Sequence, residues 1–261
     1  MANPFNFLKL PVHPPKPRHV GLFIGGDSGT PLRAQEDFLE TYHDLVDYMK
    51  LTGHVRLLSH YKTDWIVRKL DLYKKYGIDT FPGGISFEVA VLQQQTPRFF
   101  NTLREIGFAG VEISEDVIPP MAPKARSDII AQARDAGLAV FTEVGRKFPS
   151  EPMTTERLVE LIRADLESGS RMVVIERSEI VQLKQKNPQV LIDTAAAVGH
   201  DKVIFETHIP GPELLVWLIR TIGPDVNLMG HTEYCPLAHD CRLGMNRQVG
   251  YTFLTEMGGK L

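Results

Sequence analysis

Cysteines and long apolar runs are both scarce in this sequence. Its 261 residues include only two cysteines, Cys235 and Cys241, whose spacing matches no zinc-ligand pattern. We interpret them as incidental thiols rather than a redox couple, and so few cysteines indicate a reducing compartment. No run approaches the roughly 20 apolar residues of a membrane span, and prolines interrupt the segment where a secretory leader needs an apolar core. We therefore expect a cytoplasmic protein that makes no contact with a membrane.

The sequence also lacks an excess of charge of one sign. Its formal net charge is −3, whereas a nucleic-acid-binding face needs a basic stripe, so we expect no nucleic-acid partner. Two motifs of common enzyme classes are missing as well. No Gly-x-Gly-x-x-Gly follows the first apolar run, which argues against a dinucleotide site, and no serine lies in a nucleophile-elbow sequence, which leaves acyl transfer without support.

The sequence does have a repeated alternation of short apolar runs and amphipathic stretches. The runs are rich in apolar or β-branched residues and lie at 19–27, 45–51, 77–84, 110–114, 139–145, 171–177, 202–208 and 225–231. Most of the stretches between them have helical spacing, and one places Leu158, Leu161, Ile162 and Leu166 on a single stripe. The second run is ambiguous, because it could instead complete a helix that begins near Ala34.

This alternation predicts a single α/β domain. Strands that alternate with helices form a parallel sheet covered by helices. Eight such units in roughly 240 residues favour a (β/α)8 TIM barrel over an open doubly wound sheet. We expect the barrel to occupy 19–261 and an extended, proline-rich N-terminal arm to occupy 1–18. The arm would pack on the barrel or on a neighbouring subunit, and we expect a homo-oligomer.

Acidic residues follow several of the apolar runs at equivalent positions. Glu112, Glu143, Glu176 and Glu206 each lie near the end of one of four successive runs. In a barrel these strand ends meet at the face that carries the active site. Structural ion pairs at the rim are the alternative interpretation. Converging carboxylates repel unless cations offset them, and Mg²⁺ prefers oxygen ligands, so we favour a functional site that binds Mg²⁺.

Basic residues lie in or beside the same strand ends. They are Lys50, Arg146, Lys147 and Arg177. Because Arg and Lys side chains match the oxygens of phosphate and sulfonate groups, they indicate a small anionic substrate. His208 lies two residues after Glu206, on the same face of the predicted strand, and we expect it to contact the substrate.

Several further residues are weaker candidates. Asp27 follows the first run and either orients a ligand or caps a turn. Gly83 and Gly84 would let the backbone approach a phosphate. Glu88 either acts from the following helix or caps it. His231 follows the eighth run, where barrels often bind phosphate, or is structural.

These stretches together resemble the phosphosulfolactate synthase family. The resemblance runs from about Val20 to Gly244. It rests on six short segments, which indicate the family only when taken together. They are GGISFE (83–88), GFAGVEISED (107–116), FTEVGRK (141–147), IRADLESGSRMVVIE (162–176), VIFET (203–207) and VNL (226–228). The resemblance implies a (β/α)8 barrel and Mg²⁺-dependent addition of sulfite to phosphoenolpyruvate, which gives (2R)-phospho-3-sulfolactate.

The resemblance also implies roles for individual residues. The positions that match the family's pattern are Asp27, Lys50, Glu112, Glu143, Lys147, Glu176 and Glu206. We expect Glu143, Glu176 and Glu206 to bind the metal. Catalysis would then rest on Lys50, Lys147, Glu112 and Asp27. The substrate would contact Arg146, Arg177, Gly83, Gly84, His208 and His231.

The chain differs from the family in three loops after strands. It has Leu51 to Val55 where the family has x-Gly-Trp-Gly-Thr, Ser178 to Ile180 where it has Arg-Glu-Ser, and Met229 to His231 where it has Gly-Asn-Ile. All three loops are expected to touch substrate. Two alternatives therefore stay open: metal-dependent aldolase or isomerase chemistry on another phosphorylated or sulfonated acid, and a non-catalytic, stress-associated barrel protein.

Overall fold

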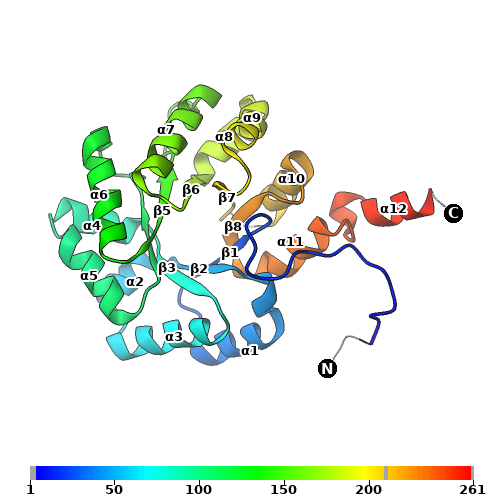
Figure 1. Ribbon diagram of the computed structural model, residues 1–261, viewed down its shortest axis with the longest axis horizontal. Coiled ribbons are helices and arrows are strands. Elements are labelled where there is room, and N and C mark those ends of the chain that lie inside the picture. The colour runs from blue at the N-terminus through cyan, green and yellow to red at the C-terminus, as the bar shows by residue number, and fades with distance from the viewer. Residues whose placement is uncertain (1–3, 209–210, 260–261) are drawn as a thin grey trace.

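The computed structural model describes residues 4–208 and 211–259, and its centre is a barrel of parallel strands. In Figure 1 the strands lie in the middle and helices surround them. The strands are β1 (Phe23–Asp27), β2 (Tyr48–Leu51), β3 (Asp79–Pro82), β4 (Gly110–Ile113), β5 (Ala139–Val144), β6 (Met172–Ile175), β7 (Val203–Glu206) and β8 (Asn227–His231).

Helices follow every strand and cover the outside of the sheet. They are α1 (Leu32–Tyr42), α2 (His54–Ser59), α3 (Thr63–Lys75), α4 (Ile85–Leu92), α5 (Thr96–Ile106), α6 (Pro123–Asp135), α7 (Thr155–Ser168), α8 (Arg177–Lys186), α9 (Gln189–Val198), α10 (Glu213–Ile222), α11 (Cys235–Arg242) and α12 (Thr252–Gly258). The expected (β/α)8 barrel is confirmed. The ambiguous second run is a strand, because the helix before it ends at Tyr42 and a short 3₁₀ turn, η1 (His43–Leu45), separates the two.

The sheet is hydrogen-bonded in the order β3-β2-β1-β8-β7-β6-β5-β4. Between its two edges, the N–H of Ala109 donates to the carbonyl of Thr80 at 3.0 Å, which brings β4 beside β3 and nearly closes the barrel. Neighbouring strands are staggered: Lys50 pairs with Gly26 on β1 and with Phe81 on β3.

Local sequence signals explain where the helices begin and end. Thr154 caps α7 by accepting a hydrogen bond from the N–H of Arg157 at 3.3 Å, and Gly169 ends this helix in the left-handed conformation at φ 111°. Residues with a Cβ are strained at such angles, so the glycine sets the stop.

Two apolar layers hold the barrel together. The larger packs the outward-facing strand residues against the helices. The smaller fills the barrel interior and consists of Leu22, Ile24, Phe81, Phe141, Met172, Val174, Ile204 and Met229. Phe141 lies at its centre, with its ring stacked on Phe81 at 4.4 Å and in edge contact with Tyr48 at 5.3 Å between centroids.

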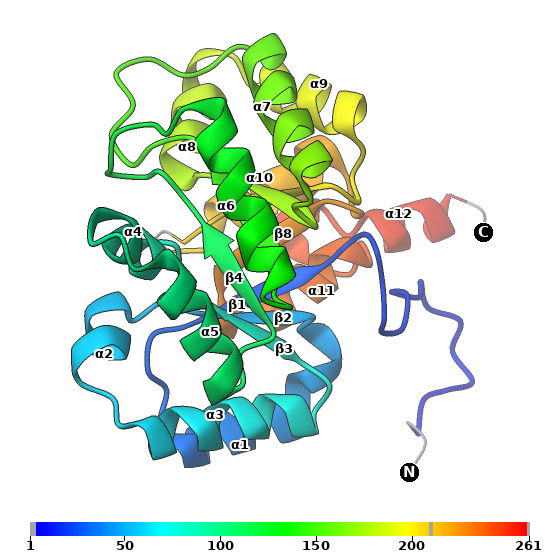
Figure 2. The same cartoon turned by 60° about the vertical axis from the view of Figure 1, so that its left-hand side comes forward.

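Residues 9–18 of the expected N-terminal arm have no regular secondary structure. Figures 1 and 2 show the N-terminal segment outside the ring of helices, on the same side of the molecule as α12. Its later part reaches the barrel. Arg18 is buried and forms an ion pair with Asp47 at 2.7 Å. The predicted division of the chain at residue 18 stays a prediction.

The interior layer yields a stability prediction. Phe141→Ala removes a fully buried ring, so we expect the free energy of unfolding to fall by about 3–5 kcal/mol. Phe148→Ala is the matched control, since Phe148 is 86% exposed, and we expect it to change stability by less than about 0.5 kcal/mol. Urea unfolding followed by circular dichroism measures both. Equal losses for the two variants would contradict the assigned interior packing.

Candidate active site

Alternation along the strands brings the acidic residues into the barrel. Phe141 and Ile204 face the interior layer, and successive strand residues point to opposite faces. Two positions further on, Glu143 and Glu206 therefore face inward at the carboxyl end of their strands. Glu112 on β4 and Lys50 on β2 reach the same level. All four side chains are buried.

Lys50 is the centre of this cluster. Its ammonium lies 2.8 Å from Oε2 of Glu112 and 3.4 Å from Oε1 of Glu206. Burial alone would lower the pKa of Lys50, but Glu112, Glu206 and Glu143 raise it well above its ordinary value. Lys50 is therefore a fixed positive charge at neutral pH.

The carboxylates around Lys50 differ in charge. Burial would raise the pKa of Glu206, but Lys50 and His208 hold it well below its usual value. Burial, Glu112 and other acids raise the pKa of Glu143 well above its usual value. Burial also raises the pKa of Glu112. We nevertheless assign the ionised form to Glu112, because its Oε2 accepts from Lys50 and, at 2.6 Å, from the N–H of Gly84. Of the two carboxyl groups with a raised pKa, Glu143 is therefore the one to which we assign a proton.

Lys147 provides the second cation, from the loop after β5. Its ammonium lies 2.7 Å from Oδ2 of Asp116 and 3.6 Å from Oε1 of Glu176. Burial would lower the pKa of Lys147, but Asp116 and Glu143 raise it above its ordinary value. Glu176 follows β6 directly and caps α8 by accepting from the N–H of Ser178.

A pocket of about 210 Å³ opens above these groups at the carboxyl end of the barrel. Its walls combine predicted site residues with residues from the neighbouring loops. They are Gly26, Ser28, Lys50, Thr52, His54, Gly84, Ile85, Glu112, Asp116, Lys147, Glu206, His208 and His231. The pocket holds two ammonium groups against three carboxylates.

Glycines give the pocket its space. A Cβ on Gly26 would lie 2.2 Å from Nε2 of His208, and one on Gly84 would lie 2.3 Å from Oγ of Ser114. His208 is oriented by Glu206, with 3.1 Å between Nδ1 and Oε1, and its ring meets His231 edge-on at 5.2 Å between centroids. The predicted His208, His231 and Gly84 thus lie together at the pocket.

Two predicted residues direct their guanidinium groups elsewhere, and a predicted glycine does not line the pocket. The guanidinium of Arg146 donates to the carbonyl of Ile118 at 3.0 Å and lines a neighbouring groove. The guanidinium of Arg177 donates to the carbonyl of His208 at 3.2 Å. Gly83 is not among the lining residues, although a Cβ added to it would meet His54 of the pocket wall at 2.5 Å.

Asp27 is buried outside this cluster. Its Oδ2 accepts from Lys69 and from the hydroxyl of Tyr73, both at 2.6 Å. Its Oδ1 accepts from the N–H groups of Gly29 and Thr30, both at 2.7 Å. Every side of the carboxylate is therefore engaged. These contacts hold the loop that carries Ser28 to the pocket, which is a positioning role.

Two important residues are weakly marked in the sequence. Asp116 ends the GFAGVEISED stretch, but nothing local indicates its ion pair with Lys147. Glu88 neither caps its own helix nor reaches the pocket. Its carboxylate accepts from Ser114 Oγ and the Asp116 N–H at 2.6 and 2.7 Å and from two further N–H groups. Glu88 thereby fixes the loop that presents Asp116.

Buried carboxylate oxygens near the pocket decide whether Mg²⁺ fits here. Within 4–208 and 211–259, no three His, Cys, Asp or Glu side chains converge as a metal site. However, Glu112 Oε1, Glu143 Oε1 and Asp116 Oδ1 are buried oxygens without a hydrogen-bond partner in the described structure. Mg²⁺ usually binds one or two carboxylates and completes its shell with water and substrate. These oxygens fit such an ion.

Comparisons with known proteins identify the family. The family model described as (2R)-phospho-3-sulfolactate synthase (ComA) matches residues 11–247. The chain belongs to this family. It is 32% identical over 238 residues to the phosphosulfolactate synthase of Methanothermobacter thermautotrophicus, covering 87% of this chain and 89% of that protein. It is 34% identical over 218 residues to that of Methanocaldococcus jannaschii, covering 80% and 84%. It is 30% identical over 230 residues to that of Bacillus subtilis, covering 85% and 88%.

The phosphosulfolactate synthase family is an enzyme family, so the expected enzyme class is confirmed. Among solved structures, 3-hexulose-6-phosphate synthase from Salmonella typhimurium shares the fold, with a TM-score of 0.50 and 15% identity. That alignment covers 90% of this chain and 99% of the other. In the described part of the chain, no helix is long and apolar enough to cross a membrane.

Asp27 gives a prediction on stability and pH. Burial would raise its pKa, but Lys69 and the other donors hold it below its usual value. Burial lowers the pKa of Lys69; three acceptors nevertheless surround its ammonium and keep it charged. A carboxyl with a lowered pKa stabilises the fold above its unfolded pKa of about 3.9 and loses this contribution as the pH falls.

We therefore expect Asp27→Asn to cost about 3–5 kcal/mol at neutral pH, because it leaves Lys69 buried without a counter-ion. The difference from wild type should shrink below about pH 4. Urea unfolding from pH 3 to 7 measures this, with Glu36→Gln as control, since its ion pair with Lys75 is exposed and contributes less than about 1 kcal/mol. A pH-independent difference would contradict the assignment.

Proposed function

We propose that this pocket adds sulfite to phosphoenolpyruvate and gives (2R)-phospho-3-sulfolactate. The main support is the pair of ammonium groups, Lys50 and Lys147, held at fixed positions in a pocket of about 210 Å³ at the barrel mouth. Both substrates are small anions, and membership of the phosphosulfolactate synthase family supports the same reaction.

The chemistry of the addition explains why fixed cations are needed. The sulfur lone pair of sulfite forms a bond to C3 of phosphoenolpyruvate, and the π bond between C2 and C3 breaks. Its electron pair moves onto C2 and the adjacent carboxylate, and a proton then bonds to C2. Preorganised positive charge beside that carboxylate lowers the barrier, because the charge develops there in the transition state.

We assign charge stabilisation to Lys50. Glu112 and Glu206 hold its ammonium, and only 6% of its side chain is exposed. A buried charge that cannot reorganise acts more strongly on a developing anion than a solvated one.

We assign proton donation to Lys147. Its side chain is 31% exposed and reaches the pocket from the loop after β5, with Asp116 at 2.7 Å and Glu176 at 3.6 Å as its ion-pair partners. Its raised pKa keeps it protonated at neutral pH. The carbanionic C2 is far more basic than an amine, so transfer from Lys147 to C2 is favourable.

We further propose that Mg²⁺ binds here with the substrate, held by Glu112 and Asp116, which both line the pocket. Each of these carboxylates has a buried oxygen without a partner in the described structure. We prefer this pair to Glu143, Glu176 and Glu206. Glu143 does not line the pocket, Glu176 contacts Ser178 and Lys147, and Glu206 contacts Lys50 and His208. When bound, the ion would supply further positive charge beside the substrate carboxylate. The cytoplasmic location and the homo-oligomer stay predictions.

A direct assay tests the proposed reaction. We expect the protein to consume phosphoenolpyruvate when sulfite and Mg²⁺ are present, measured as loss of the enolpyruvyl absorbance, and to stop when EDTA is added. Absence of turnover, together with no thermal shift on adding either anion, would exclude this function.

Lys147→Met tests the assigned proton donor in the same assay. We expect kcat to fall by about 10²–10⁴-fold, the usual contribution of a positioned acid, with the fold intact by circular dichroism. Lys186→Met is the control, since Lys186 is half-exposed and pairs with Glu151 away from the pocket. If Lys147→Met kept wild-type kcat, the role of Lys147 would be wrong even with the reaction correct.

A further inference from the structure

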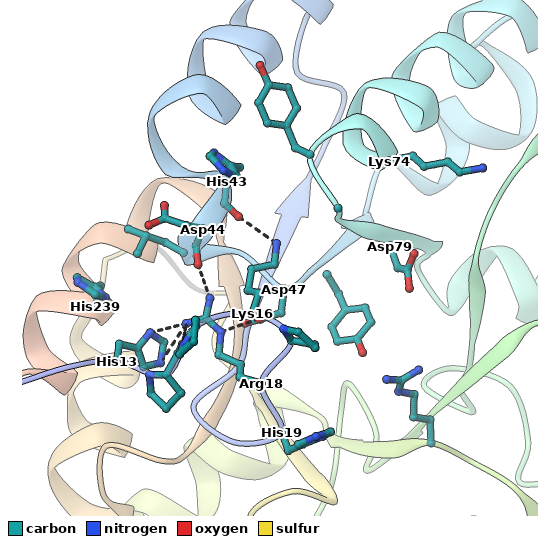
Figure 3. Close-up of a pocket in the computed structure, with 18 residues that line it drawn as sticks. His13, Lys16, Arg18, His19, His43, Asp44, Asp47, Lys74, Asp79 and His239 are labelled. Carbon is teal, nitrogen blue, oxygen red and sulfur yellow. Dashed lines mark hydrogen bonds and ion pairs between the residues drawn. The ribbon is translucent and has the colours of Figure 1, made fainter. Parts of the chain in front are cut away.

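A second and larger cavity lies at the opposite end of the barrel, beneath the N-terminal arm. Its volume is about 860 Å³, within the range of small-molecule sites. The arm lines it with residues 13–18, and the barrel lines it with His19, with the starts of β2 and β3 and with Arg171 before β6. Figure 3 shows Lys16 and His43 on one side of this cavity and Lys74 and Asp79 on the other. We call it the base cavity.

The arm is attached to the barrel beside this cavity. The Lys16 ammonium donates to the carbonyls of His43 at 3.1 Å and Val46 at 2.7 Å. Arg18 pairs with Asp47 at 2.7 Å and also donates to the carbonyl of Asp44. Arg18 is thus neutralised within the structure, whereas Lys16 is held only by neutral groups.

Of the lysine and arginine side chains that line the base cavity, Lys16, Lys74 and Arg171 form no ion pair in the described structure. Lys16 and Arg171 are the two that other groups of the cavity orient. Among the described residues, neither has a carboxylate within ion-pair distance. An ammonium has three donors, and Lys16 uses two of them on carbonyls. The guanidinium of Arg171 lies over the ring of Tyr48, 5.6 Å from its centroid, which orients it without neutralising it. Burial lowers the pKa of Lys16 by more than Asp47, Asp44 and Asp79 raise it.

The remaining polar groups of the base cavity define the rest of the ligand. Asp79 and Asp44 line the same space, and both are exposed carboxylates without an ion pair in the described structure. They would accept hydrogen bonds from hydroxyl groups. A doubly charged phosphate suits two uncompensated cations better than a carboxylate does, because it carries more charge and more acceptor oxygens.

We propose that the base cavity binds a small phosphate ester bearing hydroxyl groups, with its phosphate on Lys16 and Arg171 and its hydroxyls on Asp79. Such a ligand bridges the arm and the barrel, because Lys16 belongs to the arm and Arg171 to the barrel. It therefore ties the arm down. This site is separate from the catalytic pocket, which lies at the other end of the strands.

Isothermal titration of the full chain with glycerol 3-phosphate tests the site. The Lys147→Met variant is altered only in the catalytic pocket, so we expect it to bind glycerol 3-phosphate in the base cavity. Adding either Arg171→Gln or Lys16→Gln to Lys147→Met should weaken this binding at least about tenfold. Replacement by Arg171→Lys keeps the charge and should retain most of the affinity. Inorganic phosphate should bind more weakly than the ester, and glycerol should not bind.

The arm supplies a second readout. Trypsin cleavage after Arg18 should slow when glycerol 3-phosphate is added to Lys147→Met, and should not respond when Arg171→Gln is also present. Arg171 is exposed and lies outside the catalytic machinery. The single variant Arg171→Gln should therefore keep the circular dichroism spectrum and the kcat of the wild type, and this control shows that the variant folds. Equal affinity with and without Arg171→Gln, or no binding to Lys147→Met at millimolar concentration, would overturn the proposal.

Discussion

The active end of this barrel depends on the contact of one buried ammonium with the carboxylates around it. Lys50 lies 2.8 Å from Glu112 and 3.4 Å from Glu206, and all three side chains are buried. Buried carboxylates cannot stay ionised together without a cation among them. Lys50 therefore allows an acidic cluster to exist inside the fold, and the cluster fixes Lys50 in turn. The resulting pocket is electrostatically prepared before any substrate enters, which is the property that stabilises developing charge in a reaction.

The barrel supplies the geometry for this contact through alternation along its strands. Phe141 packs in the barrel interior, so Glu143 two residues later faces the mouth from the same side of β5. The apolar interior layer thus acts as the floor of the pocket, and β2, β4, β5 and β7 each add one charged residue above it. Loops then complete the walls: Glu88 fixes the loop of Asp116, and Asp27 fixes the loop of Ser28.

Sequence patterns predicted the strand–helix alternation and the group of strand-end residues, because both depend on short-range periodicity. They did not separate Asp27 from Glu143, although both are acids at the end of an apolar run. Asp27 faces the helices and pairs with Lys69 on α3. Because Lys69 is far from Asp27 in the sequence, no local pattern predicts this ion pair. The same limit applies to Asp116 and Lys147, whose contact joins two loops. Arg146 and Arg177 lie beside pocket residues in the sequence, but their guanidinium groups bind loop carbonyls instead. The family match to residues 11–247 assigns the enzyme family, whereas the contacts assign a task to each residue.

A double-mutant cycle on Lys50 and Glu112 tests the central claim most directly. The free energy of unfolding of Lys50→Met, Glu112→Gln and the combined variant would be measured in urea at neutral pH. The account predicts that Lys50→Met costs about 3–5 kcal/mol, because it leaves Glu112 and Glu206 buried without a cation, and that adding Glu112→Gln restores part of this loss. If Lys50→Met were as stable as wild type, or if the two effects simply added, Lys50 would not be the charge that holds the acidic cluster together.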